Sequence, residues 1–247
     1  MKRTILLVLS LMMLLGVLVG CGSQKIIVAT DATWPPMEMV NEQTKEFEGF
    51  DIDLMNAIAA EAGFEIEYRN VAWDGIFAGL AAGEYDAVIS SVTITEERQK
   101  EFDFSNPYIN AGQIVVVMAD NTDIQSSADL SGKTVAAQIG TTGAMAIQEI
   151  EGATLKEYDE IGFCFEDLLA GRVDAVVCDT PVAADYAGVQ YAGQIKLVGG
   201  AFTDEYYGIM VKKGNADLLA KINDGLKKVQ DKGIDDQLMK DWNLSGK

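Results

Sequence analysis

A twelve-residue segment of this chain recurs in its second half without a gap: residues 80–91 (LAAGEYDAVISS) align with residues 168–179 (LLAGRVDAVVCD). Each copy has the end of a helical pattern, a glycine, an acidic residue, an apolar strand and a polar end. The repeat predicts two equivalent α/β units, with Ser91 and Asp179 at equivalent strand ends. Ligands of open α/β sheets bind beyond the carboxyl ends of the strands, so the two units are expected to face each other across a cleft. The alternative is a chance similarity between two α/β units.

Strands and helices alternate along the first half of the chain. The first predicted strand leads into residues 31–37, a loop that two prolines restrict. Both predicted helices have helical apolar spacing and end at a glycine. The alternation predicts the α/β class with a largely parallel sheet. The predicted strands are 25–30, 64–68 and 86–89, and the predicted helices are 50–62 and 73–82.

The second half repeats this order. A final amphipathic region, 215–242, forms one or two helices that are split at Gly233. The predicted strands are 114–118, 134–137, 155–158, 173–177, 195–198 and 207–211, and the other predicted helices are 128–130, 142–150, 163–170 and 180–191.

The first residues form a targeting segment. A basic start at Lys2 and Arg3 precedes an apolar run over 5–19, which at about 15 residues is shorter than the roughly 20 that a membrane span needs. The run ends in Leu-Val-Gly-Cys21, which resembles the bacterial lipobox. Residues 1–20 are therefore expected to be a signal peptide, cut before a lipid-bearing Cys21, with 21–24 as anchor and linker outside the cytoplasmic membrane. The alternative is an ordinary cleaved signal peptide with a chance cysteine.

Composition excludes several classes of function. The 38 acidic residues outnumber the 19 lysines and arginines, which argues against a nucleic-acid partner. The chain has no histidine, the commonest general base and metal ligand, so no metal site and no cofactor is expected. Cys164 begins a predicted helix and Cys178 ends the next strand, so a disulfide between these neighbouring ends is a hypothesis.

A candidate anion site follows the first repeated strand. Ser90, Ser91 and Thr93 supply hydroxyls, and a short helix that begins near Thr95 carries Arg98. Alone, an arginine among charged helical residues is a solvated surface group. After a strand end rich in hydroxyls, its planar guanidinium suits a carboxylate.

These residues belong to motifs that resemble the solute-binding proteins of bacterial ABC transporters for polar amino acids. The resemblance extends over 25–244 and implies a free amino acid and a membrane permease as partners, with no reaction catalysed. The motifs are 93–98 (TITEER) with 102–105 (FDFS), 49–54 (GFDIDL), 130–133 (LSGK), 140–143 (GTTG) and 170–175 (AGRVDA).

The resemblance implies the two-lobe, type II periplasmic-binding-protein fold in a monomer. Each lobe would be a mostly parallel sheet flanked by helices, and ligand would favour a closed form through hinge rotation. Lobe one would comprise 25–106 and 207–247, lobe two 113–198, and the hinge 107–112 and 199–206.

For the ligand carboxylate, the resemblance implies a bidentate pair with Arg98 and main-chain N–H groups at Thr93 and Thr142. The run 140–143, which includes Thr141, opens a predicted helix, where free amides favour an anion.

For the ligand ammonium, the resemblance implies Asp179, the main chain at Ser91 and the hydroxyl of Thr93. Asp179 also suits the N-cap of the helix that follows it, which is compatible with that role. Trp34 and Trp73 match the aromatic positions that enclose the ligand side chain in this family.

The ligand side chain is left open. Two indole faces suit a cation, and Asp31 and Asp51 could supply a counter-charge, which points to arginine, lysine or ornithine. Glutamine or another neutral polar amino acid is the alternative, because Gln138 can donate or accept and an aspartate at position 31 also serves glutamine in relatives. The competing class is a cyclohexadienyl-dehydratase-like enzyme with a buried acid. The expected ligand-binding residues are Asp31, Trp34, Asp51, Trp73, Ser90, Ser91, Thr93, Arg98, Gln138, Thr141, Thr142 and Asp179.

Overall fold

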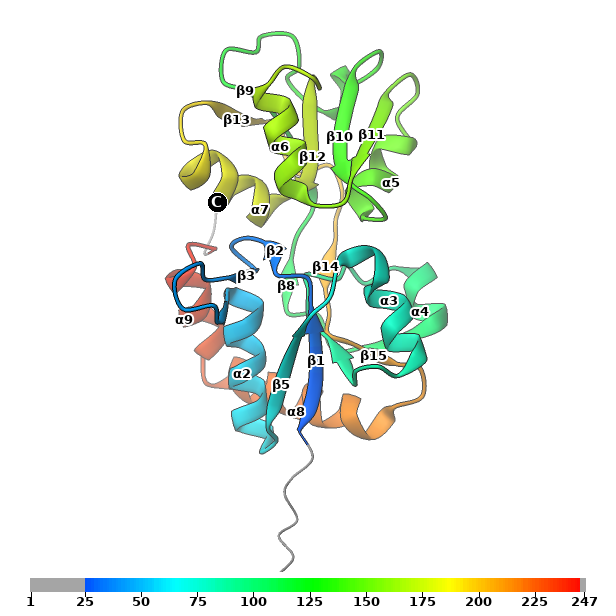
Figure 1. Cartoon of the computed structure of the whole chain (residues 1–247), viewed down its shortest axis with the longest axis vertical. Coiled ribbons are helices and arrows are strands. Elements are labelled where there is room, and N and C mark those ends of the chain that lie inside the picture. The colour runs from blue at the N-terminus through cyan, green and yellow to red at the C-terminus, as the bar shows by residue number, and fades with distance from the viewer. Residues whose placement is uncertain (1–24, 245–247) are drawn as a thin grey trace, which may run out of the picture.

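Two five-stranded sheets, one in each lobe, organise residues 25–244, the part of the chain that the computed structural model describes (Figure 1). In the first sheet only β15 runs against its neighbours, so four of the five strands share one direction. In order across the sheet, its strands are β5 (Ile66–Asn70), β1 (Ile26–Thr30), β6 (Ala87–Val88), β15 (Met210–Lys212) and β7 (Phe102–Phe104).

The second sheet has the same plan. Here β9 is the strand that runs against both neighbours. The repeated segments supply β6 and β12, each the third strand of its sheet, so the predicted equivalence of the two halves is confirmed. In order, the strands are β11 (Thr154–Tyr158), β10 (Thr134–Gln138), β12 (Ala175–Asp179), β9 (Gln113–Met118) and β13 (Ile195–Val198).

Helices flank both sheets (Figure 1). The two long helices before β6 end at the predicted residues because Gly63 and Gly83 adopt left-handed backbone (φ 74° and 80°), which glycine does at little cost. Lobe one has α2 (Phe50–Ala62), α3 (Trp73–Ala82), α4 (Glu96–Glu101), α8 (Ala216–Asp231) and α9 (Ile234–Asp241). Lobe two has η1 (Ser127–Asp129), α5 (Thr142–Gln148), α6 (Ile161–Leu169), α7 (Thr180–Asp185) and η2 (Tyr186–Gln190).

The acidic residue of each repeat has the same local role. The Oδ2 atom of Asp86 accepts a hydrogen bond from the Ile27 amide at 2.8 Å, and that of Asp174 accepts one from the Thr134 amide at 2.7 Å. Each bond ties the turn before the repeated strand to the start of the neighbouring parallel strand. This explains why both repeats keep an aspartate just before the apolar run.

The segments between the lobes differ from the prediction. Instead of one strand over 207–211, the chain forms β14 (Tyr206–Tyr207) and then β15, with Gly208 between them. A side chain at Gly208 would meet Ile94 at 2.8 Å, so the chain passes close to the first lobe there. Strand β8 (Ile109–Asn110) pairs with β14 and lies between the lobes in Figure 1.

Two further differences are local. The expected helix over 180–191 changes into a π-helical turn after α7, and residues 33–48, which include part of the predicted proline loop, form a small three-stranded sheet before α2. The strands of that sheet are β2 (Thr33–Trp34), β3 (Glu38–Val40) and β4 (Phe47–Glu48).

Cys164 and Cys178 are both buried in the apolar core of lobe two as free thiols. Burial raises the pKa of both thiols. The disulfide suggested by their spacing is therefore not formed in this structure.

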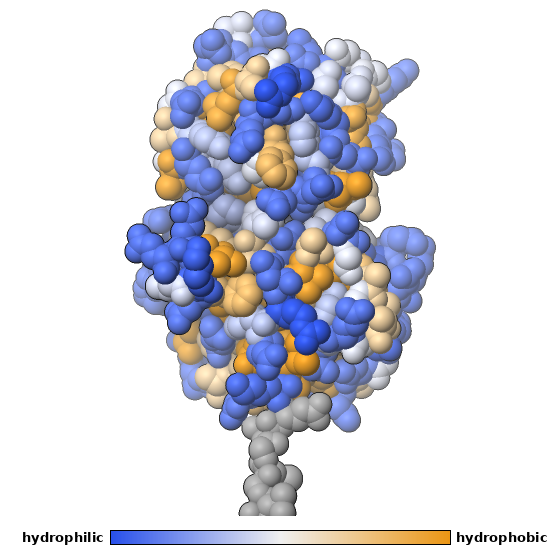
Figure 2. Space-filling view, in the orientation of Figure 1, coloured by the Kyte–Doolittle hydropathy of each residue, from blue (hydrophilic) through white to orange (hydrophobic). Residues whose placement is uncertain are grey.

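Hydrophilic residues cover most of the face that Figure 2 shows, and apolar residues are scattered between them. Between Lys25 and Leu244, no helix is both long and apolar enough to cross a membrane. The predicted signal peptide and lipobox, Cys21 included, lie outside the described residues.

Candidate functional site

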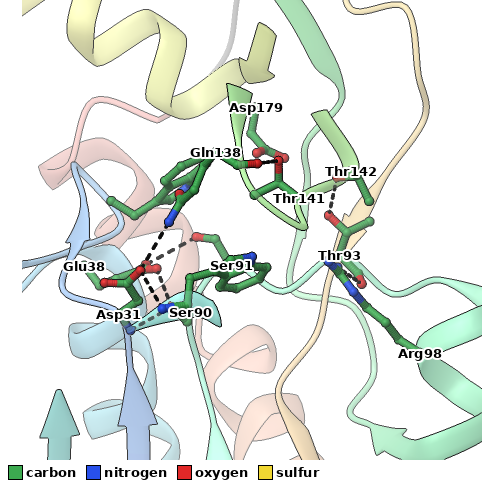
Figure 3. A pocket seen from close by; sticks show the side chains of 12 residues that line it. Asp31, Glu38, Ser90, Ser91, Thr93, Arg98, Gln138, Thr141, Thr142 and Asp179 are labelled. Atoms are coloured by element: carbon green, nitrogen blue, oxygen red, sulfur yellow. Dashed lines mark hydrogen bonds between the residues drawn. The ribbon is translucent and has the colours of Figure 1, made fainter. Parts of the chain in front are cut away.

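A pocket with about 320 Å³ of empty space, part of it open to solvent, lies between the two lobes, where the carboxyl ends of the strands of both sheets meet (Figure 3). Eleven of the twelve predicted residues line it, Asp51 does not, and Glu38 lines it without having been predicted. The lining residues are Asp31, Trp34, Glu38, Trp73, Ser90, Ser91, Thr93, Arg98, Gln138, Thr141, Thr142 and Asp179.

The end of β6 brings two serine hydroxyls to the floor of the pocket. Ser90 Oγ donates to Glu38 Oε1 at 2.9 Å and accepts from the Asp31 amide at 3.0 Å. Ser91 has left-handed backbone (φ 49°), which is uncommon for a residue other than glycine. Its Oγ donates to Glu38 Oε2 at 3.3 Å.

Asp51 lies beneath this strand end rather than in the pocket. Its side chain is fully buried, and its Oδ2 accepts from the Ser91 amide at 2.7 Å and from the Tyr108 hydroxyl at 2.8 Å. Burial raises its pKa to about 6. The prediction of Asp51 as a pocket residue is thus wrong in position, because the first turn of α2 points this carboxyl at the backbone of Ser91.

Glu38 is the pocket residue that the sequence prediction missed. It lies on β3 opposite Trp34 of β2, and its side chain has no exposed surface. Burial, helped by the nearby charge of Asp51, raises its pKa well above the usual value. The sequence did contain a signal for Glu38. The run Met-Glu-Met follows Pro35-Pro36, and alternation along a strand turns Glu38 to the side opposite the buried Met37.

Arg98 reaches from lobe one to lobe two. Thr95 caps α4 by accepting from the Arg98 amide at 3.1 Å, which sets the first turn. The guanidinium donates through Nη1 to the Thr93 carbonyl at 2.9 Å and through Nη2 to the Gly140 carbonyl at 3.3 Å. Burial lowers its pKa to about 10, so it stays charged at neutral pH.

Trp73 contacts this arginine. The guanidinium carbon of Arg98 lies 5.5 Å from the centre of the Trp73 ring and 5.1 Å from that of Phe77. Both distances fall in the range of cation–π attraction. Trp73 therefore helps to hold Arg98 in addition to lining the pocket.

Asp179 and Gln138 enter the pocket from lobe two. Asp179 occupies the N-cap position of α7, but its carboxyl makes no capping bond and instead accepts from Gln113 Nε2 at 3.0 Å. Burial, with the charge of Glu205, raises its pKa to about 7. Gln138 Nε2 donates to the Asp159 carbonyl at 2.9 Å and approaches Asp31 Oδ2 across the cleft at 3.4 Å.

The balance of charge in the pocket is unequal. Three carboxyl side chains, Asp31, Glu38 and Asp179, line it together with a single cation, Arg98. Burial raises the pKa of Asp31 as well. The lining therefore holds more acidic than basic side chains.

Among residues 25–244, no group of three or more histidine, cysteine, aspartate or glutamate residues is arranged to hold a metal ion.

Comparison with known proteins agrees with this fold. The family model for bacterial extracellular solute-binding proteins, family 3, matches residues 26–245. The L-cystine-binding protein TcyJ of Escherichia coli K12 is 32% identical over 219 residues, which cover 88% of this chain and 82% of TcyJ.

Two solved structures of an ancestral arginine-binding protein, one bound to arginine and one to glutamine, are both 41% identical to this chain with a TM-score of 0.84. The matches cover 88% of this chain and 97% of the arginine-bound structure, and 90% and 98% for the glutamine-bound one. The chain therefore belongs to family 3 of the bacterial extracellular solute-binding proteins.

Proposed function

We propose that this protein captures a free basic L-amino acid, namely arginine, lysine or ornithine, outside the cytoplasm and delivers it to an ABC permease. Family membership supports the extracytoplasmic place and the transport role. Relatives whose names give cystine and arginine as ligands support an amino acid as the ligand class.

The observation that carries the proposal is the excess of carboxyl groups in the pocket. Arg98 pairs with the ligand carboxylate, and Asp179 accepts from the ligand ammonium. Asp31 then remains for the ligand side chain, because both oxygens of Glu38 already accept from serine hydroxyls. A buried carboxylate costs free energy unless a cation or hydrogen-bond donors compensate it, so a guanidinium or ammonium group is the matching partner.

The aromatic lining supports the same choice. Trp34 is 7% exposed and Trp73 is 8% exposed, and both line the pocket. A cation against an indole face gains about 0.5 to 2 kcal/mol. Trp73 already contacts Arg98, so the more available face is that of Trp34.

Glutamine is the second candidate, and two observations favour it. Gln138 brings an amide to the cleft opposite Asp31. The indole N–H of Trp34 is buried without a hydrogen-bond partner among the described residues, and a ligand carbonyl oxygen would satisfy it. The glutamine-bound ancestral structure supports this alternative to the same degree as the arginine-bound one.

A dehydratase-like enzyme would use a buried carboxyl as a general acid toward a cyclic carboxylic acid. The pocket offers buried carboxyls, but Asp179 opposite Arg98 matches a free amino acid that is held and released. The matching family model describes binding proteins, which supports the transport role over the enzyme.

A lipid on Cys21 would hold the protein at the membrane surface. The Leu-Val-Gly-Cys21 sequence supports this part of the proposal.

A thermal-shift screen of the purified protein, freed of carried-over ligand, against the twenty amino acids and ornithine tests the proposal. A ligand present at one hundred times its dissociation constant adds about 2.7 kcal/mol to the stability of the folded state. Arginine, lysine or ornithine should give the largest shift. A shift with glutamine alone would overturn the basic specificity, and no shift with any amino acid would overturn the binding function.

A further inference from the structure

Glu205, in the second segment that joins the lobes, places its carboxylate between residues of both lobes. It is half-buried and comes one residue before β14. Its Oε2 atom accepts from the Thr142 hydroxyl of lobe two at 2.7 Å and from the Thr93 hydroxyl of lobe one at 3.0 Å. Figure 3 shows these two threonines side by side at one end of the pocket.

These contacts fix the direction of the Thr93 hydroxyl. A hydroxyl has one hydrogen to donate and two lone pairs that accept. The oxygens of Thr93 and Thr142 lie 3.3 Å apart, and both have the Glu205 carboxylate as a neighbour. A carboxylate is the stronger acceptor of the two, so the hydrogen of Thr93 points at Glu205. The oxygen of Thr93 is then left as an acceptor.

The same carboxylate is tied to the ammonium side of the pocket through Gln113. The amide nitrogen Nε2 of Gln113 lies 3.0 Å from Asp179 Oδ1 and 3.3 Å from Glu205 Oε2. The other oxygen of Glu205 accepts from the Thr203 hydroxyl at 2.7 Å, and Thr203 accepts from the Gln113 main-chain amide at 2.8 Å. Glu205 is therefore held in place from several sides.

We infer that Glu205 is a positioning residue for the α-ammonium group of the ligand: by taking the Thr93 hydrogen, it makes the Thr93 hydroxyl an acceptor in the pocket that Asp179 also lines. The inference rests on the proposed amino-acid binding function. The inference adds one point to that function. The preference for α-amino acids over the same acids without the amino group depends partly on Glu205, which does not line the pocket.

An alanine at position 205 removes this acceptor. The Thr93 hydrogen could then turn toward the pocket. A hydrogen pointing at an ammonium opposes binding, whereas it does not oppose a ligand that lacks the amino group, so the selection for the amino group should weaken. A glutamine at position 205 can keep the acceptor, because its amide oxygen can face Thr93, Thr142 and Gln113 while its nitrogen donates to the Thr203 hydroxyl.

The test compares two ligand pairs by isothermal titration calorimetry of the full protein. One pair is arginine and 5-guanidinopentanoate, which is arginine without its α-amino group, and the other is glutamine and glutaramate. The variants are Glu205→Gln, Glu205→Ala and the control Asp204→Asn. Asp204 is the exposed neighbour of Glu205, and its Oδ1 accepts from Asn110 Nδ2 at 2.8 Å, a bond that asparagine can keep.

In E205A the affinity ratio within the pair that binds should fall by about 10- to 100-fold, as for the loss of a hydrogen bond to a charged group. E205Q, which keeps an acceptor for Thr93, and D204N should both keep a ratio near that of wild type. A structural effect alone would weaken both ligands of a pair equally. A ratio within twofold of wild type in E205A, or an equal fall in D204N, overturns the inference. If the wild-type protein binds neither arginine nor glutamine, it is the proposed function that fails.

Discussion

Strands β6 and β12 share one sequence pattern, but the functional groups at their carboxyl ends carry opposite charges. Both strands are the third of their sheets, each parallel to one neighbour and antiparallel to the other. After β6 the chain bends through Ser91 in left-handed backbone and leads to Arg98. After β12 it passes directly from Asp179 into α7.

The difference shows which part of the repeat carries function. The apolar strand and the aspartate before it are kept because they build the sheet, as the matching bonds of Asp86 and Asp174 indicate. The residues after the strand are free to diverge because they face the cleft. The segment after β6 thereby brings the cation Arg98 to the pocket, and the end of β12 brings the carboxyl of Asp179.

Removing the cation of lobe one should have the largest effect. Arg98→Ala should weaken the binding of every amino acid by about 30-fold or more, because the loss of one partner of a buried charge pair costs about 2 to 5 kcal/mol. Titration calorimetry measures the loss. The control is Arg69→Ala, which removes an exposed arginine of the same lobe. Affinity retained in the Arg98 variant would contradict its role in holding the carboxylate.

Low pH should weaken ligand binding through protonation of Asp179 in lobe two, whereas Arg98 in lobe one stays charged. Asp179 has a pKa of about 7 in the empty site, because it is buried and lies near Glu205, and it must be ionised to hold the ligand ammonium. Binding therefore displaces a proton below pH 7. Affinity should approach a tenfold fall for each further pH unit, or about 50-fold between pH 7 and 5.

The raised pKa values of Asp31 and Glu38 act in the same direction for a cationic side chain. Calorimetry from pH 5 to 8 in buffers of different ionisation enthalpy measures both the affinity and the protons released. Unfolding of the empty protein at each pH controls for stability. Equal affinity at pH 5 and pH 8 would contradict the role of Asp179.

Trp34→Ala should alter selection among side chains rather than binding of the amino-acid backbone. The ratio of arginine to glutamine affinity should change by about 2- to 30-fold, which corresponds to one cation–π contact of about 0.5 to 2 kcal/mol. Trp242→Ala serves as the control, because this tryptophan bonds to Asp53 and does not line the pocket. An unchanged ratio would leave Trp34 as a packing residue only.

Substitutions of the aspartates that both repeats share should have the smallest effects, and they should change only the free energy of unfolding. Asp86→Ala should lower the free energy of unfolding by about 1 to 2 kcal/mol, since it leaves a half-buried Ile27 amide without its acceptor. Asp174→Ala should cost less, because Asp174 is exposed and water can replace its carboxylate at the Thr134 amide. Urea unfolding measures both values, and ligand affinity should stay unchanged. A larger loss from Asp174→Ala would contradict this order.

The sequence predicted those features that local signals determine. The bounds of α2 and α3 follow from apolar spacing and a terminal glycine, and the repeat identified the central strand of each sheet. Short strands such as β7, β8 and β14 escaped prediction because their pairing partners lie far away along the chain.

The candidate site divides in the same way. Polar residues directly at strand ends were placed correctly in the pocket, because strand direction alone determines where they emerge. Asp51 was predicted to line the pocket and Glu38 was not, whereas in the structure Glu38 lines the pocket and Asp51 does not. Which of the two carboxyls faces the cleft depends on how β3 and α2 pack together. Glu205 carried no signal, because its contacts with Thr93 and Thr142 exist only when the two lobes are brought together.

Strand β1 begins at Ile26, at the end of lobe one farthest from the cleft, and runs toward the pocket (Figure 1). With a lipid on Cys21, the four-residue step to Lys25 could span at most about 14 Å. The tether would thus hold the far end of lobe one against the membrane and raise the mouth of the cleft above the lipid headgroups by the height of a whole lobe. Ligand would enter from the surrounding fluid without obstruction, and the protein would have to lean over on its tether to present the cleft to a permease.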